Sequence, residues 1–107
     1  MRIYISGAMT GISDYAERFE RAEAYLRDEY GPEAEIINPA RVLAPLPETT
    51  TWGQYMDVAL NALRGCDMIY MLMGWECSIG AQIERLYAAG CRMEVEYQVW
   101  KPSEKKQ

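Results

Sequence analysis

Ser78, Gly80 and Glu84 stand close together at the start of a stretch with helical periodicity. A short apolar run, residues 68–73, precedes them, and the order strand, Gly- and Ser-containing turn, helix is typical of ligand sites in open α/β sheets. Ser78 is at the expected N-cap, and Gly80 would let a ligand approach the backbone. Free N–H groups at such a helix start can bind an anion. Glu84 follows in the second helical turn, so its carboxylate can face the same opening.

The composition excludes several kinds of protein. The chain has 107 residues, 50% of them hydrophobic, which suits one small domain with a buried core. The net charge of −5 argues against binding of a nucleic acid polymer, because no basic stripe is present to neutralise phosphates. No apolar run approaches the roughly 18 residues needed to span a bilayer, so no membrane association is expected. Residues 1–5 are too short and too polar for a signal peptide.

Histidine is absent, which limits the available chemistry. Neither Ser-His-Asp nor Cys-His catalysis is possible, and a zinc site made of cysteines and carboxylates alone is not expected. The cysteines Cys66, Cys77 and Cys91 are odd in number and lack metal-type spacing, which indicates reduced thiols in a cytoplasmic protein. Acid–base or nucleophilic work therefore falls to Asp, Glu, Tyr or Cys.

The elements around this junction alternate between strands and helices. Hydrophobic periodicity and turn residues predict strands at residues 1–6, 34–38, 68–73 and 93–99, and helices at residues 14–30, 51–63 and 79–89. Asp14 with Glu17, and Thr51 with Gln54, can form capping boxes at two helix starts. Residues 39–51 contain three prolines and read as a long loop, either a lid, an interface or a disordered segment. Core-facing stripes are expected at Tyr15, Phe19, Ala22, Leu26 and Tyr30, and at Ile79, Ile83, Leu86 and Tyr87.

The alternation of strands and helices predicts a parallel sheet of about four strands with helices on both faces. We expect the strand order 2-1-3-4, with the topological switch between the first and third strands. That order places Tyr4, Ser6 and Gly7 beside the loop at residues 74–78. One domain is expected over residues 1–100, followed by a solvated tail at residues 101–107.

Three segments carry a likeness to a known family. They are Tyr4-x-Ser6-Gly7 after the first strand, Asp57 in the helix before the third strand, and Ser78-x-Gly80-x-x-x-Glu84. Together they resemble the nucleoside 2-deoxyribosyltransferase-like superfamily, above all its small, mostly uncharacterised phage and bacterial members. The resemblance covers about residues 1–98 and implies a flavodoxin-like three-layer α/β sandwich.

The resemblance also implies an activity, the cleavage or transfer of the N-glycosidic bond of a (deoxy)nucleoside or its 5′-monophosphate. Glu84 matches the family nucleophile, Asp57 the acid–base aspartate and Tyr4 the tyrosine of the first strand, which could orient Glu84. Glu84 is expected to be ionised near the helix N-terminus, while Asp57 would protonate the leaving base. No metal ion or organic cofactor is implied. The base, ribose versus deoxyribose, and hydrolysis versus transfer stay open.

The family pattern further implies residues that hold the substrate or its phosphate, namely Ser78, Gly80, Ser6, Gly7 and Trp75. Trp75 could stack on the base or pack inside the protein. Serine at position 78 matches the 5′-monophosphate hydrolases and predicts a preference for monophosphates. Two positions depart from the hydrolase pattern: Gln82 stands where a second glycine is usual, and Glu76 adds negative charge near the expected phosphate.

Two alternatives to an enzyme remain at this stage. The chain could be a catalytically silent nucleotide-binding or sensing module, or a purely structural subunit of an oligomer. A homodimer or homotetramer is expected, because the helix at residues 52–63 carries more apolar surface than one face of so small a domain needs. Contact through that helix would bring the 39–51 loop of one chain near the mouth of its partner.

Overall fold

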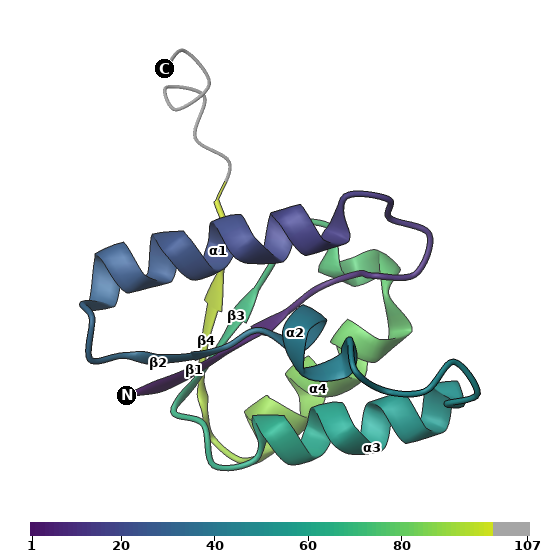
Figure 1. Ribbon diagram of the computed structural model, residues 1–107. Helices are drawn as coiled ribbons and strands as arrows, with labels where there is room; N and C mark the ends of the chain where they lie inside the picture. The colour runs from purple at the N-terminus through teal and green to yellow at the C-terminus, as the bar shows by residue number, and fades with distance from the viewer. Residues whose placement is uncertain (100–107) are drawn as a thin grey trace.

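The computed structural model describes residues 1–99 and shows one parallel sheet with helices on both sides (Figure 1). The strand order is β2-β1-β3-β4, and every pairing is parallel. The strands are β1 (Arg2–Ser6), β2 (Glu35–Ile37), β3 (Met68–Met71) and β4 (Glu94–Tyr97). The predicted α/β, flavodoxin-like class and the order 2-1-3-4 are confirmed. The expected tail at residues 101–107 lies outside the described residues.

The helices cover the two faces of this sheet (Figure 1). They are α1 (Tyr15–Tyr30), α2 (Pro39–Leu43), α3 (Trp52–Leu63) and α4 (Ile79–Gly90), with a 3-10 turn, η1 (Trp75–Cys77), directly before α4. Because side chains alternate along a strand, β1 supplies both faces of the sheet. Ile3 and Ile5 face α1, whereas Tyr4 faces α4. None of the described helices is both long and apolar enough to cross a membrane.

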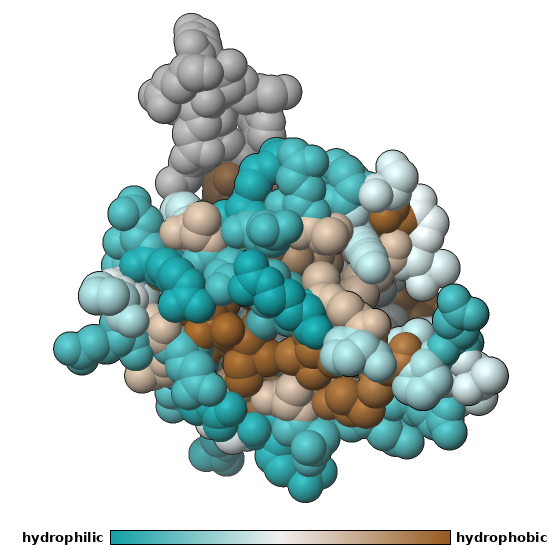
Figure 2. Space-filling view, in the orientation of Figure 1, coloured by the Kyte–Doolittle hydropathy of each residue, from teal (hydrophilic) through white to brown (hydrophobic). Residues whose placement is uncertain are grey.

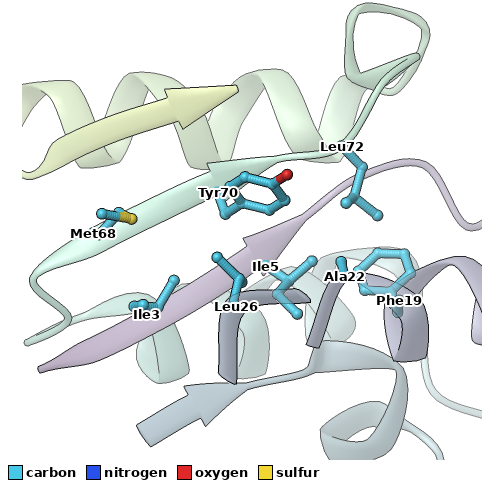
Figure 3. Close-up of a cluster of buried hydrophobic side chains, with 8 residues drawn as sticks. All are labelled: Ile3, Ile5, Phe19, Ala22, Leu26, Met68, Tyr70 and Leu72. Carbon is cyan, nitrogen blue, oxygen red and sulfur yellow. The ribbon is translucent and has the colours of Figure 1, made fainter. Parts of the chain in front are cut away.

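Two hydrophobic clusters lie on opposite faces of the sheet. Figure 3 shows the first, in which α1 packs against β1 and β3; it contains Ile3, Ile5, Phe19, Ala22, Leu26, Met68, Tyr70 and Leu72. The second joins β1, β3, the end of α3 and α4, and it contains Tyr4, Leu63, Cys66, Ile69, Met71, Ala81 and Ala88. Helix α1 gives Phe19, Ala22 and Leu26 to the first cluster, while the buried residues that α4 gives to the second are alanines only. That difference lets α4 lie close to the sheet.

The start of α4 follows the prediction, but its buried face does not. Ser78 caps the helix, since its hydroxyl accepts a hydrogen bond from the Ala81 N–H at 3.1 Å. The expected core stripe is wrong at Ile79 and Leu86, which are 67% and 65% exposed. The buried residues of α4 are instead Ala81, Glu84 and Ala88. Small side chains face the sheet here, so a pattern based on hydrophobicity alone selects the wrong face.

The starts of the other helices agree with the sequence prediction at α3 and differ from it at α1 and α2. The Thr51–Gln54 capping box at the start of α3 is confirmed. The box expected at Asp14 is wrong: its side chain makes no capping hydrogen bond and lies 3.6 Å from the Arg18 guanidinium. The expected loop at residues 39–51 begins with the helix α2. Asn38 caps this helix through the Ala40 N–H, and Pro39 occupies its first turn, where proline is favoured.

Candidate active site

Glu84 lies beneath the carboxyl end of β1, and its side chain is almost entirely buried. Tyr4 donates a hydrogen bond from its hydroxyl to Oε2 of Glu84 at 2.7 Å, and Ser6 donates one to Oε1 at 2.6 Å. Tyr4 and Ser6 are fully buried, and Glu84 is 7% exposed. Each oxygen of the carboxylate is therefore held by one neutral hydroxyl group from the same strand.

The fold brings these groups together for simple reasons. Tyr4 and Ser6 alternate with Ile3 and Ile5 along β1, so both hydroxyl groups face α4. Ala81 and Ala88 flank Glu84 on the inner face of α4 and are small enough for the helix to approach the strand. The carboxylate therefore reaches hydroxyl groups far away in the sequence. The structure thus contains the expected hydrogen bond from Tyr4 to Glu84, and it places Ser6, expected to hold substrate, against Glu84 and outside the cavity lining.

Burial dominates the electrostatics of this trio. Burial raises the pKa of Glu84 above its ordinary value, while the hydrogen bonds from Ser6 and Tyr4 act in the opposite direction without cancelling it. The expected effect of the helix N-terminus, which would favour the ionised form, is thus outweighed. Burial, together with the nearby Glu84 carboxylate, raises the pKa of Tyr4 well above its usual range. Tyr4 therefore stays protonated and acts as a donor toward Glu84.

A cavity of about 560 Å³ opens above Glu84. Its walls come from the loop after β1, the start of α1, α2, α3 and the start of α4. The lining residues are Gly7, Met9, Thr10, Ile12, Ser13, Tyr15, Pro39, Ala40, Leu43, Ala44, Trp52, Tyr55, Met56, Ala59, Ser78, Gly80, Ala81 and Glu84. Glu84 is the one charged side chain among these described residues. The cavity thus combines apolar and aromatic walls with hydroxyl groups and a single carboxylate, a common composition for small-molecule sites.

Two glycines of the predicted site are needed for packing as well as for access. A Cβ atom at Gly80 would lie 3.2 Å from the Met56 sulfur, so glycine lets α3 and α4 approach each other at the cavity wall. A Cβ atom at Gly7 would lie 3.0 Å from the side chain of Leu72 in the first core cluster. Both glycines line the cavity, as does Ser78. The predicted binding residues Ser78, Gly80 and Gly7 thus share one cavity with Glu84.

Asp57 is not brought to this cavity within one chain. It is exposed on α3 and lines a separate cavity of about 450 Å³ beside the segment that follows α2. Its neighbours there are Leu46, Pro47, Thr49, Thr50, Gln54 and Val58. Of the expected trio, the structure therefore unites Glu84 and Tyr4 but places Asp57 apart from them. Its role as the acid stays a prediction.

Trp75 also lies outside the lining of the cavity. Its ring has the guanidinium of Arg85 5.1 Å from its centre and the ring of Tyr97 6.0 Å away. Of the two interpretations of Trp75, packing fits this position, because the side chain lies against the second core cluster. Glu76 is exposed in η1, and its carbonyl oxygen accepts a hydrogen bond from the Gln82 side chain at 2.6 Å. Gln82 thus connects the first turn of α4 to η1.

Comparison with known proteins places the chain in a family. A family model described as "Domain of unknown function (DUF4406)" matches residues 1–97. The chain belongs to the DUF4406 family. No curated protein and no solved structure matches it. The match covers β1 through β4, so both Glu84 and its hydroxyl partners belong to the DUF4406 domain.

Several cavity residues of this DUF4406 chain were not predicted as site residues. The sequence pattern predicts a core stripe for Tyr15 and an oligomer interface for the apolar face of α3, which includes Trp52, Tyr55 and Met56. The structure places all four in the cavity lining. The signal in the sequence was the wide apolar face of α3, which is broader than packing on the sheet requires. Within residues 1–99, no group of three or more His, Cys, Asp or Glu side chains could hold a metal ion.

Proposed function

We propose that this protein cleaves or transfers the N-glycosidic bond of a (deoxy)nucleoside or its 5′-monophosphate, with Glu84 as the nucleophile. The observation that carries the proposal is the buried Glu84 carboxylate at a cavity, held by Tyr4 and Ser6 at 2.7 and 2.6 Å. A buried carboxylate with neutral donors and no cation is expensive to keep charged, and such groups cluster at active sites. The family resemblance supplies the bond type.

The proposed reaction has two steps. One oxygen of Glu84 attacks C1′ of the sugar as the C1′–N bond breaks, and the bonding electron pair leaves with the base. The base takes up a proton, and an ester between Glu84 and C1′ remains. Water or a nitrogen of a second base then attacks C1′, its proton passes to solvent, and Glu84 leaves as the carboxylate. Tyr4 and Ser6 orient the carboxylate before it attacks and stabilise its charge again once the second step releases Glu84.

The source of the proton for the leaving base is tested by two matched variants. Asp57 matches the family acid but is exposed outside the cavity, whereas the hydroxyl-bearing Tyr55 lines it. If Asp57 is the acid, Asp57→Asn lowers base release by about 10²- to 10⁴-fold and Tyr55→Phe has little effect. The reverse result would assign protonation of the base to the cavity wall and would remove Asp57 from the mechanism.

The charge of the cavity favours an unphosphorylated substrate. Glu84 is the one charged side chain among the described lining residues, and the Ser78 hydroxyl already accepts a hydrogen bond from the Ala81 N–H. A phosphate would therefore meet a negative charge and no cation there, which weighs against the preference expected from Ser78. Calorimetry with the four deoxynucleosides and their 5′-monophosphates tests this. Tighter binding of a monophosphate than of its nucleoside would contradict it.

One observation favours the alternative of a catalytically silent nucleotide-binding module. Asp57 lies apart from Glu84, so a single chain holds the nucleophile without its expected acid. The decisive experiment incubates the protein with the same panel and follows free base by chromatography. Base release that is lost in Glu84→Gln supports the enzyme. Binding without base release would support the silent module.

We also propose a homodimer or homotetramer, as expected from α3. Figure 2 shows apolar side chains gathered between α1 and α3, over the region where α2 lies. Val42 of α2 is 38% exposed and Trp52 at the start of α3 is 54% exposed. Trp52, Tyr55 and Met56 also line the cavity, which leaves less apolar surface on α3 for a partner. Light scattering at micromolar concentration tests the proposal, and a mass near that of one chain would refute it.

A further inference from the structure

Glu23 is a second buried carboxylate, on α1 and outside the proposed chemistry. It is 6% exposed, and both its oxygens accept charge-assisted hydrogen bonds. Arg27, one turn further along α1, donates to Oε2 at 2.8 Å. Arg41 donates to Oε1 at 2.7 Å, and the side-chain amide of Asn38 donates to the same oxygen at 3.2 Å. Glu23 therefore joins α1 to the beginning of α2.

Asn38 connects Glu23 to the backbone of α2. It is 4% exposed, and its Oδ1 accepts a hydrogen bond from the Ala40 N–H at 3.0 Å. Because the amide nitrogen donates to Glu23, the amide oxygen must face the helix start. The Asn38 carbonyl also accepts hydrogen bonds from the N–H groups of Arg41 and Val42. Glu23 thus fixes the orientation of the N-cap of α2.

The helix α2 depends on such contacts and forms part of the cavity wall. It spans five residues, and a helix this short is not stable by itself because nucleation is unfavourable. Pro39, Ala40 and Leu43 of α2, and Ala44 after it, line the cavity above Glu84. The shape of the cavity on this side is therefore set by how firmly α2 is held.

We infer that Glu23 is a positioning residue for the candidate active site, holding α2 in place as a cavity wall through Asn38 and Arg41. The inference rests on the proposed function only in taking this cavity as the substrate site. Glu23 does not line the cavity, so it acts through α2 and not on the substrate. The side chains of Arg41 and Arg27 are 61% and 48% exposed, so both guanidinium groups keep contact with solvent when Glu23 is replaced.

Amide hydrogen exchange tests the structural half of the inference without any ligand. In Glu23→Gln, the amides of residues 40–44 should exchange about tenfold faster, as expected when a charge-assisted hydrogen bond is lost, while those of β3 stay protected. Arg41→Gln should reproduce this pattern with Glu23 intact. Glu17→Gln is the matched control, because Glu17 pairs with Arg21 one turn along the same helix at the surface.

A kinetic split tests the functional half, with 2′-deoxyadenosine as the probe. Glu23→Gln should raise KM about tenfold and leave kcat within about twofold, since the wall binds substrate but performs no chemistry. Unchanged exchange at residues 40–44, or faster exchange in every element, would overturn the inference. A tenfold loss of kcat with an unchanged KM would also overturn the inference. If the parent protein releases no base, the proposed function fails, while the exchange result still decides the role of Glu23.

Discussion

Glu84 and Glu23 are buried to nearly the same extent, at 7% and 6% exposure, but they have different neighbours. Glu84 accepts hydrogen bonds from two neutral hydroxyl groups, and burial raises its pKa despite them. Burial also acts to raise the pKa of Glu23, yet the hydrogen bonds and charges of Arg27, Asn38 and Arg41 reverse this and lower it. The same residue type is thus shifted in opposite directions within one small domain.

Glu23 is therefore a carboxylate whose charge stabilises the fold, whereas the charge of Glu84 does not. A carboxylate paired with guanidinium groups favours the folded state when ionised. One surrounded by neutral donors has its pKa raised by burial, so the folded state disfavours its charge. Groups of the second kind are found where chemistry needs them, which is why Glu84 and not Glu23 is the candidate nucleophile. Four experiments would break or sharpen this distinction.

The largest effect is expected from Glu84→Gln. Base release should fall by at least about a thousandfold, because the amide cannot form the ester with C1′. At neutral pH the variant should also be more stable than the parent by roughly 0.5–2 kcal/mol, since the charge disfavoured by burial is gone. Chromatography of free base and urea unfolding measure the two effects. Glu76→Gln, an exposed position in the preceding turn, is the control, and turnover of Glu84→Gln like that of the parent would remove the nucleophile assignment.

Tyr4→Phe should have the next largest effect, through the charge state of Glu84. The hydroxyl of Tyr4 favours the ionised carboxylate, so its loss should raise the pKa of Glu84 further. The acidic limb of the kcat/KM profile should move to higher pH, with a loss of about ten- to a hundredfold below neutrality. Ser6→Ala should shift the limb in the same direction. If the acidic limb stays unchanged in both variants, the Tyr4 and Ser6 hydroxyl groups do not set the pKa of the group whose ionisation controls kcat/KM.

Glu23→Gln should change stability with the sign opposite to that of Glu84→Gln. Removal of the charge weakens hydrogen bonds from two guanidinium groups, and the free energy of unfolding should fall by about 1.5–3 kcal/mol. Urea unfolding measures the loss. The exposed Glu17–Arg21 pair provides the comparison, since Glu17→Gln should stay within about 0.5 kcal/mol of the parent. Equal losses of unfolding free energy in Glu17→Gln and Glu23→Gln would mean that burial of the Glu23 hydrogen bonds does not increase their contribution to stability.

The sequence predicted what depends on local pattern and on the pairing of parallel strands. The capping roles of Ser78 and Thr51 followed from residue types at fixed local spacing. The strand order followed from the alternation of strands and helices, which is compatible with few sheet topologies. The family resemblance also predicted that Tyr4 contacts Glu84, whereas the contact between Ser6 and Glu84 was not predicted. The direction of Asp57 was not predictable in the same way. It depends on the rotation of α3, a helix whose apolar residues extend over a wide face that both the core and the cavity share.

The Glu23 network could not be predicted because it depends on a short helix inside a proline-containing segment. Nothing in residues 39–51 shows helical periodicity over a useful length, so α2 was expected as loop. The rotation of α4 was missed for a different reason. Ile79 and Leu86 are the more hydrophobic choice for a core, but Ala81 and Ala88 allow the close approach that Glu84 needs to reach β1. Packing distance, not hydrophobicity, decides which face is buried.

The smallest effect, and the most direct test of the contrast, is the pH dependence of stability. The folded-state pKa of Glu84 is raised, so its contribution to stability is complete below the pKa of glutamate in the unfolded chain and is lost as pH rises through the folded-state value. The folded-state pKa of Glu23 is lowered, so its contribution is complete above the unfolded pKa and is lost as pH falls through the folded-state value.

The two variants should therefore diverge from the parent in different pH ranges. The stability gained by Glu84→Gln should grow as pH rises from about 4 toward neutrality, the range above the ordinary pKa of glutamate. The stability lost in Glu23→Gln should be constant near neutrality and shrink as pH falls below that value. Urea unfolding of the parent and both variants at a series of pH values gives the two difference curves directly. Curves that run parallel would mean that the two carboxylates titrate alike, and the guanidinium groups beside Glu23 would then not explain its stabilising role.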